Sequence, residues 1–377
     1  MPVSNGGANP SDDTCRVMVV DDSSVVRAIV TRSLESDPGI KVVSSVANGA
    51  LALKLLPSLA VDVIVLDVEM PEMDGIQALP QLLAISPGIK VIMVSSLTRR
   101  NADISLRALS LGAADYVPKP TTGLSSADDF RIELVTKVKA HGARARRSVG
   151  TGSGAQMRSA AISSPRIGGV APVTTIALRK ATIEKPAVIA IGSSTGGPQA
   201  LSEVLKSIGP GVTQPIVITQ HMPPTFTAIL AEHMTRYAGR PAAEAQDREI
   251  LKPGHIYIAP GGLHMIAEAQ GTSTMLRLSD APPENSCRPA VDPMLRSLSA
   301  IYGKRLLTVI LTGMGYDGLK GCKVVAAAGG TVLAQDQASS VVWGMPGAVA
   351  QAGICNAVLP LSEIGKTIGR IARGETL

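Results

Sequence analysis

Short apolar runs alternate with amphipathic stretches over most of this 377-residue chain, and this alternation constrains its fold most strongly. The first series of apolar runs predicts strands at 16–20, 41–46, 61–66, 91–94 and 115–117. Helical patterns are predicted near 25–35, 50–59, 76–85, 101–111 and 127–140. Such an alternation predicts a doubly wound (βα)5 unit, in which a parallel sheet is covered by helices on both faces.

The same alternation restarts near residue 188 and predicts a second α/β domain with a mostly parallel sheet. Its strands are predicted at 188–191, 216–220, 255–259, 306–311 and 331–334. A stretch rich in Gly, Ser, Ala and Thr separates the two series, and we interpret it as a flexible linker. The predicted organisation is a disordered tail at 1–13, a first domain at 14–140, a linker at 141–184 and a second domain at 185–377.

The net charge of +6 would favour nucleic acid as a partner if it lay on one folded face. Many of the basic residues instead fall around the predicted linker: Lys137, Lys139, Arg144, Arg146, Arg147, Arg158, Arg166, Arg179 and Lys180. We interpret this stretch, which also holds His141, as solvated rather than as a DNA-binding arm. Aromatic residues make up only 2% of the chain, which argues against the stacking surfaces that bind single strands. We therefore expect no nucleic-acid partner.

The cysteines and the hydropathy indicate a cytoplasmic protein. Cys15, Cys287, Cys322 and Cys355 lie far apart, and the chain shows no signal-peptide pattern, so reduced thiols are expected. No segment approaches about 18 uninterrupted apolar residues, so direct membrane insertion is not expected.

Acidic residues follow two predicted strands of the first domain. Asp21 and Asp22 end the first strand and Asp67 ends the third, at the sheet edge where ligands gather in doubly wound folds. Crowded carboxylates repel one another unless a cation lies among them, and oxygen ligands suit Mg²⁺. Ser95 and Lys119 follow the fourth and fifth strands and could hold a phosphoryl group.

A turn rich in Gly and Ser follows the first strand of the second domain. The string at 192–197, Gly-Ser-Ser-Thr-Gly-Gly, matches the Gly-x-Ser-x-Gly pattern of nucleophile elbows and precedes Pro198, which can open a helix. Hydroxyls and free N–H groups at such a junction can present a nucleophile or cradle a phosphate. The turn alone leaves both uses open.

If Ser194 is a nucleophile, it needs a base and an acid that orients the base. His221 ends the neighbouring predicted strand and is the first candidate base, with His264 as the fallback. Asp317 follows the strand at 306–311 and is the candidate acid, although capping the next helix is an alternative role. Its surroundings at 313–318 also match Gly-x-Gly-x-x-Gly, with Asp336 about 20 residues on, so a dinucleotide site competes.

The first domain resembles a response-regulator receiver domain. The resemblance rests on Asp21-Asp22, on the string from Leu66 to Gly75 and on that from Tyr116 to Pro120. It implies that Asp67 accepts a phosphoryl group from a histidine kinase. It also implies that Asp21, Asp22, Asp67 and the Glu69 carbonyl hold Mg²⁺, and that Ser95, Tyr116 and Lys119 respond to the phosphate.

The second domain resembles the catalytic domain of chemotaxis protein-glutamate methylesterases, the CheB family. The matching strings are those at 192–198, 220–223, 258–265, 288–292 and 311–318. The family implies a Rossmann-like fold, hydrolysis of glutamate γ-methyl esters on chemoreceptors, and deamidation of receptor glutamines. Ester hydrolysis is expected to need no cofactor.

The resemblance also assigns roles to single residues. It implies a catalytic triad of Ser194, His221 and Asp317. Thr195 and Met314 are candidates for the oxyanion site, and Arg288 is a candidate contact to an acidic receptor surface. Ser193 stands where the family often has Ala.

Two other functions remain open at this point. One is a nucleotide-binding switch or DNA-binding regulator, in which the second domain binds a ligand. The other keeps the esterase but gives it a receptor-like substrate outside chemotaxis.

Overall fold

The computed structural model describes residues 14–119, 124–150, 176–180 and 184–376. The chain divides into two compact units, one formed mainly by residues up to Gly154 and one mainly by those that follow. The predicted tail at 1–13 and most of the predicted linker, including Arg158 and Arg166, lie outside the described residues.

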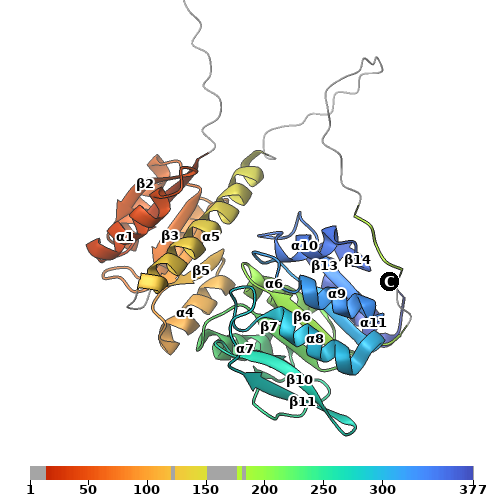
Figure 1. Ribbon diagram of the computed structural model, residues 1–377. Helices are drawn as coiled ribbons and strands as arrows, with labels where there is room; N and C mark the ends of the chain where they lie inside the picture. The colour runs from red at the N-terminus through yellow and green to blue at the C-terminus, as the bar shows by residue number, and fades with distance from the viewer. Residues whose placement is uncertain (1–13, 120–123, 151–175, 181–183, 377) are drawn as a thin grey trace, which may run out of the picture. The chain divides into compact units, whose positions relative to one another are not determined.

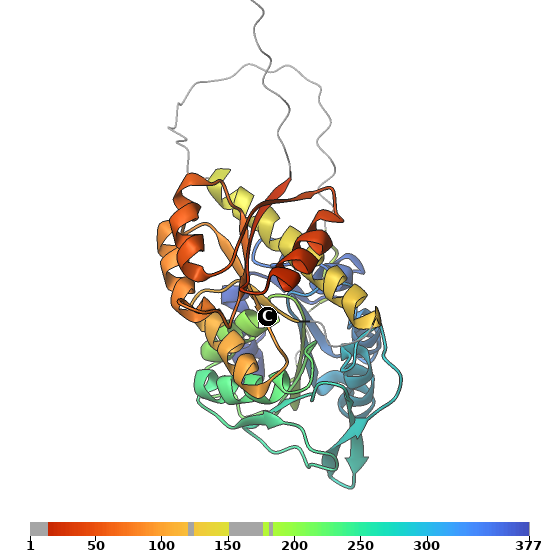
Figure 2. The ribbon, with the colours of Figure 1, turned by 90° about the vertical axis from the view of Figure 1, so that its left-hand side faces the viewer.

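The N-terminal unit is built on a five-stranded parallel sheet with the order β2-β1-β3-β4-β5. Its strands are β1 (Cys15–Val20), β2 (Ile40–Val46), β3 (Val63–Asp67), β4 (Lys90–Ser95) and β5 (Asp115–Pro118). The helices along this part of the chain are α1 (Ser24–Glu35), α2 (Gly49–Leu55), the short 3-10 turn η1 (Leu56–Ser58), α3 (Gly75–Ile85), α4 (Arg99–Ser110) and α5 (Leu124–Gly150). The predicted doubly wound parallel sheet is confirmed (Figures 1 and 2).

Burial explains why the strands of this sheet read as continuous apolar runs. Every residue of β3 is buried, because helices cover both faces of the sheet. On one face, Val19 of β1 packs in a cluster with Leu34 of α1 and Leu134 of α5. Asp67, the one charged residue of β3, is its last residue and is also buried. The carboxyl end of the sheet is therefore polar directly next to the apolar core.

Helix α5 extends beyond its predicted end near Ala140, as far as Gly150. The interpretation of Lys137 and His141 as solvated is wrong, because both are buried. The Lys137 ammonium lies 3.2 Å from one oxygen of Asp115, and His141 Nε2 lies 3.3 Å from the other. The sequence before the glycine-rich stretch therefore belongs to the folded unit.

The C-terminal unit is built on a seven-stranded parallel sheet with the order β14-β13-β12-β6-β7-β9-β8. Its strands are β6 (Val188–Ser193), β7 (Ile216–Gln220), β8 (Ala242–Glu244), β9 (Ile256–Ile258), β12 (Leu306–Ile310), β13 (Thr331–Gln335) and β14 (Ala357–Leu359). The helices are α6 (Gly197–Ser207), α7 (Phe226–Ala238), α8 (Val291–Tyr302), the 3-10 turn η2 (Gly303–Arg305), α9 (Leu319–Ala327), α10 (Met345–Gln351) and α11 (Leu361–Arg373). The predicted second α/β domain is confirmed.

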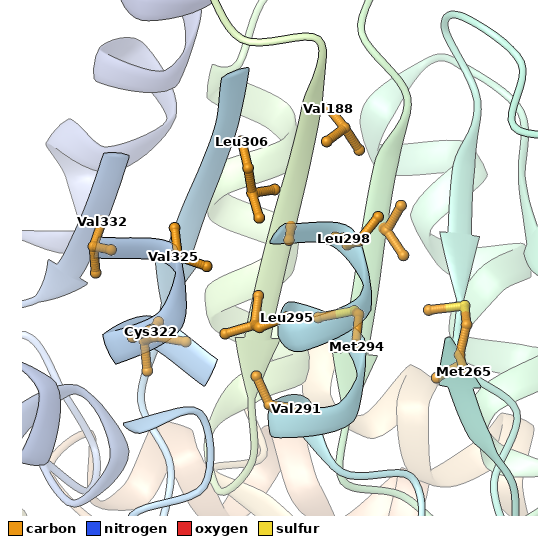
Figure 3. Packing of buried hydrophobic residues seen from close by; sticks show 14 of the residues in the cluster. Val188, Met265, Val291, Met294, Leu295, Leu298, Leu306, Cys322, Val325 and Val332 are labelled. Carbon is orange, nitrogen blue, oxygen red and sulfur yellow. The ribbon is translucent and has the colours of Figure 1, made fainter. Parts of the chain in front are cut away.

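An antiparallel hairpin and helix α8 interrupt the alternation between β9 and β12. The hairpin joins β10 (His264–Gln270) to β11 (Ser273–Ser279), and the Ser297 hydroxyl of α8 accepts a hydrogen bond from the Ala267 N–H of β10. On its inner face, α8 places Val291, Leu295 and Leu298 in the core cluster (Figure 3). The N-terminus of α8 is thereby fixed relative to the sheet.

Strand β6 lies at the topological switch point of the sheet, where the order in which the chain adds strands reverses. The chain runs from β6 outward through β7 and β9, and it later returns so that β12 pairs with the other side of β6. Ligands of open α/β sheets bind at such a switch point, outside the carboxyl ends of the strands. Ser194 follows β6 at this edge.

The short described segment at 176–180 binds to the C-terminal unit, so the solvated interpretation of Arg179 is also wrong. Its N–H donates to the carbonyl of Cys355, and its guanidinium donates to the carbonyls of Ala326 and Gly330. These two carbonyls lie at and just beyond the end of α9, where the helix dipole favours a cation.

All four cysteines are free thiols, as expected. Among the described residues, no helix is long and apolar enough to cross a membrane.

We expect Leu298→Ala to destabilise the C-terminal unit by about 2–5 kcal/mol, because it leaves a cavity between α8 and the sheet. Val324→Ala on α9 is the matched control, since that side chain is 41% exposed, and it should cost less than about 0.5 kcal/mol. Chemical denaturation followed by circular dichroism measures both values. Equal losses for the two variants would contradict this account of the core.

Candidate active site and phosphoacceptor site

The turn after β6 is shaped by glycines that allow close contacts. Gly196 has a φ of 73°, in the left-handed region, and α6 begins at the next residue with a proline in its first turn. A Cβ on Gly197 would lie 1.9 Å from Oε1 of Gln220. The Ser194 N–H donates to the Thr312 carbonyl, 3.0 Å away, which ties the turn to the loop after β12.

Ser193 and Gln220 connect the ends of β6 and β7 by side-chain hydrogen bonds. The Ser193 hydroxyl donates to Oε1 of Gln220 at 2.6 Å. This hydrogen bond fixes the orientation of the amide, so its Nε2 group points away from Ser193. The Gln220 Nε2 group then donates to the backbone carbonyls of Ser194 and His221, at 2.9 and 3.2 Å. The two residues predicted to be nucleophile and base are held to one side chain.

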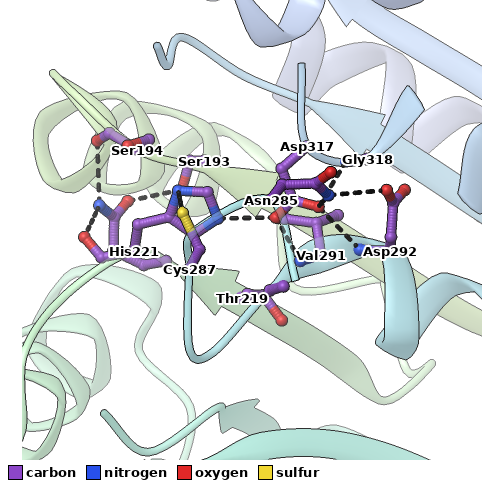
Figure 4. A network of polar contacts seen from close by, with 12 residues as sticks. Ser193, Ser194, Thr219, His221, Asn285, Cys287, Val291, Asp292, Asp317 and Gly318 are labelled. Carbon is purple, nitrogen blue, oxygen red and sulfur yellow. Dashed lines mark hydrogen bonds and ion pairs between the residues drawn. The ribbon is translucent and has the colours of Figure 1, made fainter. Parts of the chain in front are cut away.

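His221 and Asp317 lie together, as the sequence predicted. His221 Nε2 is 2.8 Å from Oδ2 of Asp317, and their side chains are only 13% and 2% exposed (Figure 4). A carboxylate at this distance fixes the imidazole orientation and favours its protonated form.

The Asp317 carboxylate does not cap α9, whose N-cap is Gly318 without a side-chain hydrogen bond, so the alternative role as a helix cap is wrong. Its Oδ2 also accepts a hydrogen bond from the N–H of Val291, and its Oδ1 accepts from the N–H groups of Asp292 and Gly318. Two of these donors belong to the N-terminus of α8. Burial would raise the pKa of Asp317, but the hydrogen bond and charge of His221, with these donors, hold the pKa below its usual value.

The other ring nitrogen of His221 faces a thiol. Nδ1 lies 3.4 Å from Sγ of Cys287, which the sequence reasoning did not select. Burial would lower the pKa of His221, but the hydrogen bonds to Asp317 and Cys287 outweigh it and raise the pKa to about 9. Within the described residues, the Ser194 hydroxyl makes no hydrogen bond, so the candidate acid and base are paired with each other while the candidate nucleophile is paired with neither.

The candidate oxyanion donors border this turn. Gly313 lies so close that a Cβ there would be 2.9 Å from Cβ of Ser194. Within the described part of the chain, the N–H groups of Thr195 and Met314 make no hydrogen bond. The Met314 residue as a whole is 40% exposed.

The remaining sequence candidates have structural contacts. His264 is buried, with Nε2 3.1 Å from the Pro282 carbonyl and Nδ1 accepting the N–H of Ala290. Neither ring nitrogen of His264 lies against a carboxylate, so His264 lacks the orienting acid that His221 has in Asp317. The Arg288 guanidinium donates to the carbonyls of Asp280 and Ala281 and remains exposed.

Asp336, the acid that a dinucleotide site would use, has a local role instead. Its carboxylate accepts hydrogen bonds from the N–H and the hydroxyl of Ser339, at 2.9 and 2.6 Å. Asp336 is therefore engaged locally, and the Asp317 carboxylate lies in the glycine-rich turn where a pyrophosphate would have to bind. The Gly-x-Gly-x-x-Gly match thus lacks the arrangement of turn and acid that a dinucleotide needs.

The N-terminal unit gathers the predicted acidic cluster. Carboxylate oxygens of Asp21, Asp22 and Asp67 all lie within 4.8 Å of one another. The Lys119 ammonium lies 2.9 Å from Asp21 and 2.8 Å from Asp67. Burial raises the pKa of Asp67 to about 6 against the opposing effect of Lys119, and the charge of Asp21 adds to the rise. Converging oxygens with unneutralised charge fit a divalent cation such as Mg²⁺.

The other residues of this predicted site occupy the same edge of the sheet. Ser95 ends β4 and is buried, and its carbonyl accepts the N–H of Lys119 at 2.7 Å. Tyr116 on β5 is also buried, and its carbonyl accepts a hydrogen bond from Lys137. Glu69 follows β3 with an exposed side chain outside the carboxylate cluster, so only its carbonyl remains a candidate ligand.

Comparison with known proteins covers nearly the whole chain. Residues 189–368 match the CheB methylesterase family, and residues 17–125 match the response regulator receiver domain. The chain is 58% identical to protein-glutamate methylesterase/protein-glutamine glutaminase 1 of Paramagnetospirillum magneticum, over 97% of this chain and 98% of that protein. It is 56% identical to the Azospirillum brasilense protein-glutamate methylesterase/protein-glutamine glutaminase, over 96% and 93%.

Among solved structures, the CheB methylesterase catalytic domain of Thermotoga maritima is 40% identical. It covers 50% of this chain and 100% of its own, with a TM-score of 0.49. The two family models and the curated relatives, which match over nearly their full length, lead to one conclusion. This chain belongs to the CheB family of protein-glutamate methylesterases with an N-terminal receiver domain.

Proposed function

We propose that this protein hydrolyses glutamate γ-methyl esters on chemoreceptors with a Ser194–His221–Asp317 triad, and that phosphorylation of its receiver domain activates it. The observation that carries the proposal is the buried His221–Asp317 pair at 2.8 Å, held by Gln220 to the turn that bears Ser194. The names of its relatives support the methyl-ester substrate and a second activity on protein glutamines.

The first half of the reaction transfers the glutamyl group to the serine. Ser194 Oγ attacks the ester carbonyl carbon while Nδ1 of His221 takes its proton, because Nε2 is occupied by Asp317. The N–H groups of Thr195 and Met314 stabilise the resulting oxyanion. The C–O bond to the methoxy group then breaks, and His221 returns the proton so that methanol leaves.

The second half restores the enzyme. Water attacks the glutamyl-serine ester while His221 takes its proton and then passes it to Ser194 Oγ, which frees the glutamate. Asp317 stays ionised throughout and stabilises the imidazolium. A glutamine side chain reacts in the same way with ammonia as the leaving group. The exposed guanidinium edge of Arg288 is proposed to meet acidic receptor surface.

In the receiver domain, we propose that a histidine kinase phosphorylates Asp67. Asp21, Asp22, Asp67 and the Glu69 carbonyl would hold Mg²⁺, which supplies positive charge that offsets the charge of the phosphoryl group. Lys119 and Ser95 then bind the phosphoryl oxygens, and Tyr116 adjusts its packing. The unphosphorylated receiver is proposed to inhibit the esterase.

Ser194→Ala should abolish most ester hydrolysis, with kcat reduced by about 10³-fold or more, because no other hydroxyl replaces the nucleophile. Methanol release from a methylated chemoreceptor fragment measures the loss. Ser202→Ala, in the adjacent helix α6, is the control and should retain normal activity. Undiminished methanol release by Ser194→Ala would eliminate the proposed triad.

Because the base must be neutral, kcat/KM for ester hydrolysis should rise with pH until His221 deprotonates near its pKa of about 9. Cys287→Ala removes one cause of the raised pKa, so the rising limb should move to lower pH. Cys355→Ala, at a buried thiol outside these contacts, should leave the limb in place. If the rising limb stays at the same pH in Cys287→Ala, this thiol does not raise the pKa of His221.

Asp67→Asn should remove activation of the intact chain by a small acyl-phosphate donor with Mg²⁺, because the amide cannot accept the phosphoryl group. Wild-type activity should rise by about 5- to 150-fold under the same conditions, the range of ordinary allosteric coupling. Asp128→Asn, at an exposed residue of α5, is the control. Equal activation of wild type and Asp67→Asn would place the phosphoacceptor elsewhere.

A further inference from the structure

Asn285 bridges two buried carboxylates beside the candidate triad. Its Nδ2 group donates one hydrogen bond to Oδ1 of Asp317 at 2.8 Å and one to Oδ2 of Asp292 at 3.0 Å (Figure 4). Both aspartates are almost fully buried. An amide nitrogen carries two hydrogens, so both donors of Asn285 are used by these acids.

We infer that Asn285, aimed by Asp292, is a positioning residue that holds the Asp317 carboxylate in the orientation that receives His221. This inference rests on the proposed function, because it concerns the acid of that triad. Among the described residues, Asn285 makes no hydrogen bond to His221, so it acts through Asp317.

The division of contacts between the two oxygens of Asp317 supports this role. Oδ2 receives the imidazole and the N–H of Val291, while Oδ1 receives Asn285 and the N–H groups of Asp292 and Gly318. The backbone donors come from both sides, from α8 and from the turn itself. Asn285 is the one side chain besides His221 that donates to this carboxylate among the described residues.

Asp292 explains why the Asn285 amide presents its nitrogen. One oxygen of Asp292 accepts the N–H of Gly321 at 2.6 Å, and the other is left for Asn285. A carboxylate can only accept, so it selects the NH2 end of the amide. Burial raises the pKa of Asp292, and the nearby charge of Asp317 adds to this, so a shared donor between the two acids offsets repulsion.

The loop that carries Asn285 is held in place independently of the acids. Glu284 makes two hydrogen bonds of 2.7 Å to the Arg296 guanidinium on α8. Glu284 and Cys287 also exchange backbone hydrogen bonds of 3.1 and 2.9 Å around Asn285. Asn285 has a φ of 52°, a left-handed conformation that asparagine tolerates better than most residues. The amide therefore approaches Asp317 from a fixed backbone.

Asn285→Asp tests the inference because it keeps the shape of the side chain but cannot donate to both acids, since a carboxyl group offers one donor when protonated and none when ionised. We expect kcat of the intact, phosphodonor-treated protein to fall by about 10- to 150-fold, the effect of losing a hydrogen bond to an ionised group, with KM nearly unchanged. Asp292→Asn is the second variant. It replaces the carboxylate that accepts from Asn285 by an amide, which no longer selects the NH2 end of the Asn285 side chain. We expect kcat to fall in this variant also.

Asn356→Ala is the matched control, because Asn356 is another buried asparagine of this unit, bonded to the Val332 N–H and the Lys180 carbonyl. It should reduce thermal stability without lowering kcat. Normal kcat in folded Asn285→Asp and Asp292→Asn proteins would overturn the inference, since a side chain that only fills space would be replaced without loss.

A measurement without substrate separates this inference from the proposed function. The downfield proton resonance of the His221–Asp317 hydrogen bond can be followed by NMR in the Ser194→Ala protein. Adding Asn285→Asp should shift this resonance or abolish it by faster exchange, and adding Asn356→Ala should not. An unchanged resonance would overturn the inference, whereas ester hydrolysis that survives Ser194→Ala would overturn only the triad.

Discussion

The site depends on keeping one buried carboxylate ionised. Asp317 is 2% exposed, and burial of a charge is costly unless donors surround it. The structure provides these donors from three places: the N-terminus of α8, the glycine-rich turn after β12 and the Asn285 amide. The hairpin and the core packing of α8 matter to the chemistry because they place those N–H groups at the carboxylate.

The receiver site solves the opposite problem. There, carboxylate oxygens of Asp21, Asp22 and Asp67 lie within 4.8 Å of one another. The Lys119 ammonium pairs with two of these carboxylates, those of Asp21 and Asp67. Negative charge at Asp317 is balanced by fixed donors, whereas negative charge at Asp67 remains only partly balanced. A fully compensated carboxylate suits a permanent catalytic role, and a partly compensated one suits a reaction that changes its charge.

The sequence predicted both sheets and the residues at their strand ends, because parallel strands buried on both faces give apolar runs that end in polar residues. Ser194, His221 and Asp317 could be found in this way. Asn285 and Cys287 could not, since they lie in an irregular loop whose conformation depends on α8 and on left-handed residues. The end of α5 was missed because Gly142 looks like a helix terminator, yet its lack of a side chain is what lets it pack against Cys15.

The ring orientation of His221 has a mechanical consequence. With Nε2 bound to Asp317, the nitrogen left for proton transfer is Nδ1, which is one bond nearer the main chain. A swing of the whole side chain about the Cα–Cβ bond therefore moves the reacting nitrogen less than it moves the anchored one. The hydrogen bond to Asp317 restrains that far end of the ring. The placement of the candidate base thus follows the backbone at the end of β7, which Gln220 holds to the turn that carries the candidate nucleophile.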